Sequence, residues 1–215
     1  MFGLSENSKE VDDYGIFVYI WFIMCLMRKA IILHGTPEKE EYFSDKYPAC
    51  SNHHWFPWLQ KQLLIRGIFA RTPEMPEAYK PDYKKWRDEF ERFNVDDNTT
   101  LIGHSCGGGF LVRWLSENKV YGDKLILVAP WLDPDRRKTS DFFDFRIDPD
   151  ISKRFKEIHL FISRDDEKDI LTSVDAIKKV IPNIIFHNFN NKGHFCIEDL
   201  KTEAFPELLE VILSD

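Results

Sequence analysis

The sequence predicts an α/β fold, a three-layer sandwich in which helices cover both faces of a mostly parallel sheet. Two observations carry this prediction. Short apolar stretches alternate along the chain with longer stretches whose apolar residues recur at helical spacing. The short stretches are apolar at nearly every position, which is typical of strands buried on both faces of a parallel sheet.

The first predicted strand covers 30–33, where four apolar residues precede His34 and Gly35. A helix is predicted over 54–65, because its tryptophans, leucines and isoleucine fall near helical spacing. Gly67 follows as a stop signal, and a short strand is expected at 68–70.

The next helix is predicted over 82–93, with Asp82 as its N-cap. Its aromatic residues recur at i, i+3, i+7 and i+10 and therefore share one helix face. The remaining elements repeat the alternation. They are strands at 99–102, 124–129, 158–162 and 184–189, and helices at 110–115, 170–181 and 205–213.

Composition limits the possible functions. The chain has 215 residues, of which 43% are hydrophobic, so we expect one globular domain with a core of its own. Its net charge of -7 argues against a nucleic-acid partner, which would require clustered Lys and Arg. The four cysteines show no C-x-x-C spacing and the histidines no H-E-x-x-H, so we expect a reducing, cytoplasmic compartment and no metal site.

The first 26 residues stand apart from this pattern. Their start is polar and acidic, and residues 16–27 then form a run of twelve apolar residues. A bilayer span needs about 20 such residues, so a transmembrane helix is not expected. An extra packed element, weak membrane association through 16–27, and translation from Met27 are the alternatives, and we favour the last. The domain is accordingly assigned to 27–215, with 1–26 as an unassigned extension.

Residues 101–110, LIGHSCGGGF, contain the strongest chemical signal. Gly103 to Gly107 form a G-x-S-x-G pattern between a predicted strand and a predicted helix, which is the context of a nucleophile elbow centred on Ser105. A phosphate-binding loop is excluded because no Lys follows the glycines, and their spacing does not match a dinucleotide fingerprint. The backbone N–H groups of Cys106 and Thr36 are the expected oxyanion donors.

A serine nucleophile requires a base and a group that orients the base. His194 follows the strand predicted at 184–189, and the acids Asp165 and Asp166 follow the strand predicted at 158–162. This order, serine then acid then histidine, is that of hydrolases built on such sheets. The residues alone do not decide between the two adjacent aspartates. A solvated acid pair and a structural loop histidine are the competing interpretations.

The segments LIGHSCGG, SRDDEKD and NKGHF together resemble the α/β-hydrolase superfamily. SNHHWFPWLQKQL and TPEMPEAYKPDYKKW are similar to segments of the small serine hydrolases grouped with retinoblastoma-binding protein nine and its bacterial relatives. The resemblance extends from Met27 to the C-terminus. It implies a Ser-Asp-His triad of Ser105, Asp166 and His194, since the second acid of the family's S-x-D-D pattern serves the triad, and it implies no cofactor. The L-x-C-x-E sequence is absent, so no retinoblastoma-type partner is expected.

The expected function is hydrolysis of a small ester or amide through an acyl-enzyme, with thioesterase or peptidase activity left open. The alternative is a catalytically weak hydrolase-fold protein that acts as a binding module. Only a short segment, 130–157, separates two strands where a cap would insert, so we expect no large cap domain and an open cleft. Phe142, Phe143 and Phe145 in that segment either anchor it to the core, which we favour, or form one wall of an acyl pocket.

Overall fold

The computed structural model describes residues 27–139 and 141–214. Its sheet has six strands, all parallel, in the order β2-β1-β3-β4-β5-β6. The strands are β1 (Lys29–Leu33), β2 (Phe69–Arg71), β3 (Thr99–His104), β4 (Gly122–Val128), β5 (Phe155–Ser163) and β6 (Ile184–Phe189). This arrangement confirms the predicted α/β fold class.

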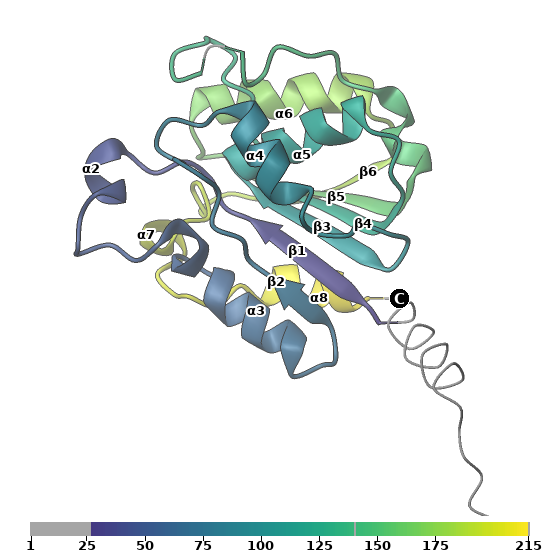
Figure 1. The fold of residues 1–215 in the computed structure, drawn as a ribbon, viewed down its shortest axis with the longest axis horizontal. Helices are drawn as coiled ribbons and strands as arrows, with labels where there is room; N and C mark the ends of the chain where they lie inside the picture. Colours follow the sequence, from purple (N-terminus) through teal and green to yellow (C-terminus); the bar gives the residue numbers. More distant parts are fainter. Residues whose placement is uncertain (1–26, 140, 215) are drawn as a thin grey trace, which may run out of the picture.

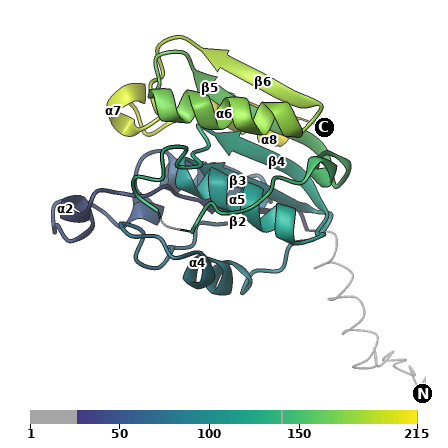
Figure 2. The same ribbon diagram turned by 90° about the horizontal axis from the view of Figure 1, so that it is seen from above.

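Helices cover both faces of the sheet, as Figure 1 shows. On one face lie α3 (Phe56–Leu64) and α8 (Pro206–Leu213). The other face is covered by α4 (Tyr83–Phe90), α5 (Cys106–Glu117) and α6 (Lys168–Val180). The view from above places these three helices side by side (Figure 2). Each main helix coincides with a predicted one, with ends shifted by a few residues.

Four short elements were not predicted from the sequence. They are α2 (Lys39–Tyr42), η1 (Cys50–Asn52), η2 (Pro149–Lys153) and α7 (Ile197–Leu200). None exceeds five residues, so none spans enough turns to produce an apolar periodicity. Two of them, α2 and α7, lie beside the loops that follow β1 and β6, where the site is built (Figure 1).

The strand order reverses between β1 and β3, which makes this the switch point of the sheet. The chain leaves β1 toward β2 on one side and leaves β3 toward β4 on the other. Leu33 pairs with Gly103, so the turns that follow β1 and β3 leave the sheet side by side. In open α/β sheets, ligands bind in the crevice at the carboxyl ends of the strands at such a point.

The segment after β4 is anchored to the core and builds no large cap. Phe142 is 1% exposed, and its ring packs edge-on against Trp86 with 5.2 Å between ring centroids. The preferred interpretation of the Phe142 region as an anchor is therefore confirmed. No described helix is long and apolar enough to cross a membrane. The apolar residues 16–26, on which any membrane association would depend, lie outside the described residues.

Two histidines on neighbouring strands contact each other away from the switch point. His159 Nδ1 of β5 lies 3.0 Å from His187 Nε2 of β6, and the His187 ring stacks on Phe161. Burial lowers the pKa of both imidazoles, and His159 lowers the pKa of His187 further. Both rings are therefore neutral at pH 7 in the folded protein.

We expect the free energy of unfolding to decrease as pH falls below about 6.5, the ordinary histidine pKa. The unfolded chain then binds protons that the folded chain does not accept until lower pH, so protonation favours unfolding. Urea unfolding measured between pH 7 and pH 5 checks this. His187→Gln, which keeps a polar side chain but does not titrate, is expected to flatten the pH dependence. An unchanged slope in that variant contradicts the assignment.

Candidate active site

Ser105 lies at the turn between β3 and α5 in a backbone conformation that non-glycine residues rarely adopt, with φ 51° and ψ -122°. The surrounding chain holds this turn. Ser105 N–H donates to the carbonyl of Val128, and the Ser105 carbonyl accepts from the N–H groups of Gly109 and Trp131. Such backbone strain, typically about 1–3 kcal/mol, persists where the fold over-determines it, and it concentrates at functional sites.

The glycines after Ser105 allow α5 to begin against the sheet without space for side chains. A Cβ on Gly107 would lie 2.5 Å from the His34 carbonyl oxygen, and one on Gly109 would lie 1.9 Å from the carbonyl oxygen of Trp131. Both contacts are with backbone, which cannot move aside. Glycine therefore serves close packing here, although it lowers intrinsic helix stability by about 1 kcal/mol per residue.

His194 and Asp166 are brought together from the loops that follow β6 and β5. His194 Nδ1 lies 3.1 Å from Asp166 Oδ1 and 3.2 Å from Oδ2, and the Asp166 side chain is 1% exposed. Because a carboxylate only accepts, Nδ1 carries the proton and Nε2 presents a lone pair. This is the tautomer that a general base requires.

The adjacent acid, Asp165, serves a different contact. Its carboxylate accepts from the Ser163 hydroxyl and from the N–H of Gly193 at 3.2 Å, and it does not contact the His194 ring. These hydrogen bonds lower the Asp165 pKa, with the Ser163 contact as the largest cause. Asp165 therefore shapes the loop that carries His194, and Asp166 faces the imidazole.

The backbone of His194 is held on both sides. Its N–H donates to Asp199 Oδ2 at 2.9 Å, and its carbonyl accepts from His104 Nε2 at 2.8 Å. His104 is the residue before Ser105, so one buried imidazole connects the two loops directly. Burial holds the His104 pKa well below its usual value, and the neighbouring His194 and His54 lower it further.

The HHW sequence before α3 holds the residues after His194. Trp55 Nε1 donates to the Phe195 carbonyl at 3.1 Å, and His54 Nδ1 accepts from the Ile197 N–H at 3.2 Å. The Trp55 side chain is fully buried and belongs to the hydrophobic core. It also supplies a polar contact that helical spacing does not reveal.

The loop after β1 supplies the second expected oxyanion donor, and His34 orients it. His34 Nε2 accepts from the Met75 N–H at 2.9 Å, so Nδ1 carries the proton and donates to the Gly35 carbonyl at 2.7 Å. In a trans peptide, the carbonyl of Gly35 and the N–H of Thr36 point in opposite directions. A Gly35 carbonyl turned toward His34 therefore turns the Thr36 N–H away from it.

The Cys106 N–H, in the first turn of α5, has no partner within the helix.

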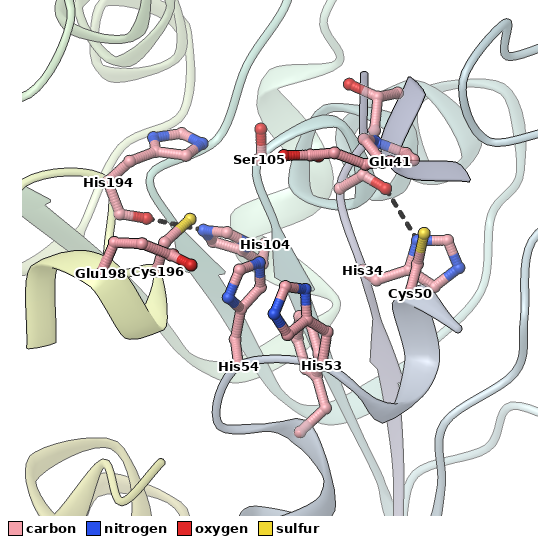
Figure 3. Close-up of a pocket in the computed structure, with 14 residues that line it drawn as sticks. His34, Glu41, Cys50, His53, His54, His104, Ser105, His194, Cys196 and Glu198 are labelled. Atoms are coloured by element: carbon pink, nitrogen blue, oxygen red, sulfur yellow. Dashed lines mark hydrogen bonds between the residues drawn. The ribbon is translucent and has the colours of Figure 1, made fainter. Parts of the chain in front are cut away.

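These loops enclose a pocket of about 180 Å³. Figure 3 shows Ser105 and His194 at the same end of it. The lining residues are His34, Gly35, Thr36, Pro37, Glu41, Cys50, His53, His54, Phe56, His104, Ser105, His194, Cys196 and Glu198, with no Lys or Arg among them. In the described part of the chain, the Ser105 hydroxyl and His194 ring share no hydrogen bond. Catalytic pairs are often loose before substrate binds.

The cysteines near the pocket are poor nucleophiles in this setting. Burial raises the pKa of Cys50 and of Cys196 to about 12, and it raises that of Cys106 well above its usual value. Since the thiolate is the nucleophilic form of cysteine, these thiols are weak nucleophiles near neutral pH. Ser105, which lines the same pocket as His194, is the better candidate nucleophile.

A family model described as serine hydrolase matches residues 45–211 of the chain. YdeN of Bacillus subtilis, which is named as a hydrolase, is 28% identical over 191 residues, covering 82% of this chain and 95% of YdeN. The serine hydrolase RBBP9 of Rattus norvegicus is 25% identical over 177 residues, covering 76% of this chain and 87% of RBBP9. The crystal structure of YdeN superimposes with a TM-score of 0.72 at 25% identity, covering 86% of this chain and 96% of that one.

Replacing Trp55 by Phe tests the hold on the loop after His194. The variant keeps an apolar ring but leaves the Phe195 carbonyl buried without its donor, which typically costs about 1–3 kcal/mol. We expect a matching decrease in the free energy of unfolding in urea. Trp58→Phe, at a partly buried position in the first turn of α3, is the control and should lose less. Equal losses in the two variants would contradict the role of Trp55 Nε1.

Proposed function

The chain belongs to the serine hydrolase family, and from this premise we propose that it cleaves small esters or amides through an acyl-enzyme formed on Ser105. The observation that carries the proposal is the pairing of His194 Nδ1 with the buried Asp166 carboxylate, in a pocket that also contains Ser105. This pairing leaves Nε2 as the basic nitrogen on the side of His194 that can serve the serine.

In the proposed reaction, Ser105 Oγ attacks the substrate carbonyl carbon while His194 Nε2 takes the hydroxyl proton. Asp166 stabilises the imidazolium that forms, and the N–H groups of Thr36 and Cys106 stabilise the oxyanion. His194 returns the proton to the leaving oxygen or nitrogen, which departs and leaves the acyl-enzyme. Water, activated by the same imidazole, then releases the acid and restores Ser105.

The pocket favours small substrates without negative charge. Its volume of about 180 Å³ lies below the roughly 300–1,000 Å³ of sites that enclose drug-sized ligands. Glu41 and Glu198 line it and no cationic side chain does, so an acyl group that carries a carboxylate would be repelled. We therefore propose short acyl groups, neutral or cationic, as the substrate class. Thioesters fit the same chemistry.

Ser105→Ala is expected to abolish covalent labelling by a fluorophosphonate probe, because the alanine has no hydroxyl to phosphonylate. Labelling is measured by intact mass. Ser152→Ala, outside the pocket, is the control and should label like the parent chain. Labelling that survives in Ser105→Ala contradicts the nucleophile assignment. Labelling of the parent chain without turnover of any short ester, thioester or amide would favour a binding module instead.

The adjacent aspartates provide a matched pair of variants. Asp166→Asn is expected to lower kcat for a short p-nitrophenyl ester by about 10³–10⁴-fold, because an amide facing Nδ1 favours the wrong imidazole tautomer. Asp165→Asn keeps an acceptor oxygen for Ser163 and Gly193, so we expect a loss of about tenfold or less. A larger loss in Asp165→Asn than in Asp166→Asn would reverse the proposed roles.

A further inference from the structure

A second chemical feature of the pocket lies on the side of α7, where three potential metal ligands meet. One ligand atom from each of His54, Cys196 and Glu198 lies within 4.8 Å of the others. Figure 3 shows these side chains gathered together, with His104 between them and Ser105. The proposed hydrolysis uses none of the three as a reacting group.

We propose that His54, Cys196 and Glu198 bind a divalent zinc ion and that zinc bound there inhibits the hydrolase. Nitrogen, thiolate sulfur and carboxylate oxygen together form a ligand set that zinc accepts, and three protein ligands leave the fourth position open to water or a substrate atom. The inhibition rests on the proposed function, whereas the binding of zinc does not.

The distances are compatible with this metal. Zinc bonds of about 2.0–2.3 Å place two ligands of a tetrahedral site roughly 3.3–3.8 Å apart. A separation of up to 4.8 Å therefore requires contraction of about 1 Å. Glu198 is exposed and Cys196 and His54 are half-buried, so small side-chain rotations can supply it.

The two segments that carry the ligands are already joined without metal. The Ile197 N–H, between Cys196 and Glu198, donates to His54 Nδ1 at 3.2 Å across 143 positions of sequence. The ligands are therefore held near one another before an ion arrives. Coordination by His54 displaces this hydrogen bond, whether the metal binds Nδ1 or the proton moves to Nδ1 and the metal binds Nε2.

The charge of the pocket suits a cation. Its lining includes the carboxylates of Glu41 and Glu198 and no Lys or Arg. His54 Nδ1 accepts a hydrogen bond from the Ile197 N–H, so this ring nitrogen carries a lone pair that a metal ion can use. As the zinc–sulfur bond forms, the Cys196 thiol releases its proton to solvent, and no oxidation state changes.

Zinc at this position would hinder the reaction by occupying the space that a substrate needs. It would fill part of a pocket of about 180 Å³ that also contains Ser105 and His194. No local metal-binding motif contains this set, because His54 and Cys196 are far apart in the sequence.

Zinc binding is measured on the full chain by competition with a chromogenic zinc chelator, and Co²⁺ replaces zinc to give a thiolate charge-transfer absorption. We expect one zinc per chain at this site. Cys196→Ser and Glu198→Gln should each weaken zinc binding by at least about tenfold. Cys50→Ser and Glu41→Gln, which change the same residue types elsewhere in the pocket lining, should change it by less than about twofold.

Equal losses in Cys196→Ser and Cys50→Ser, or no loss in either, overturn the ligand assignment. Circular dichroism verifies that each variant is folded. If Cys196→Ser does not fold, Glu198→Gln still tests the ligand assignment, because Glu198 is exposed and its replacement should not disturb the fold. Hydrolysis of a short p-nitrophenyl ester is then followed with added zinc and with a chelator. Activity that persists in zinc-loaded chain overturns the inhibition. Failure of the proposed function gives a different result: the metal-free chain is then not labelled by a fluorophosphonate probe, whatever the outcome of the zinc-binding measurements.

Discussion

The peptide turn at Ser105 is the constraint on which the site depends. A non-glycine residue at φ 51° is strained, so its backbone must be held in place by its neighbours. Here Val128 at the end of β4 accepts from the Ser105 N–H, and Gly109 in α5 and Trp131 after β4 donate to the Ser105 carbonyl. That hold requires α5 to start against the sheet, which in turn requires Gly107 and Gly109 where a Cβ would meet backbone. The parallel register then sets Gly35 beside Ser105: a Cβ on Gly35 would lie 2.8 Å from that of Ser105. One strained residue thus determines the packing of three loops at the switch point.

The second determinant is a set of neutral histidines that act as hydrogen-bonding groups and not as charges. His34 fixes the peptide that carries the expected oxyanion donor Thr36, and His104 fixes the backbone of His194. Each uses its imidazole in one defined tautomer, and burial keeps each neutral by lowering its pKa. A Lys or Arg in place of His104, whose ring centroid lies 4.9 Å from that of His194, would introduce a buried charge there and oppose formation of the imidazolium. Uncharged donors therefore organise the site without disturbing the one imidazole that the proposed mechanism needs to titrate.

The alternation of elements and the turn around Ser105 could be predicted from the sequence because both are local. The buried strands are short apolar runs, and the elbow is confined to five residues between a strand and a helix. Local sequence pattern could not show that Asp166, and not Asp165, contacts His194. The two acids are adjacent and lie at nearly the same distance along the chain from His194, so only the geometry of their loop distinguishes them. The tasks of His34, His54 and His104 also escape local analysis, because their partners are backbone groups of distant residues such as Met75 and Ile197. A lone histidine in a sequence shows no sign of such a partner.

The loop from His194 to α7 is held by hydrogen bonds from three other parts of the site. Asp199 holds the N–H of His194, His104 holds its carbonyl, and Trp55 holds the next carbonyl. α7 begins three residues after His194, and its Asp199 accepts from the His194 N–H, so this helix is coupled directly to the backbone that carries the imidazole. The segment after β4, anchored by Phe142, adds no cap that could shield the loop. α7, its N-cap Cys196 and the HHW segment thus place carboxylate, thiol and imidazole side chains in the same pocket as Ser105.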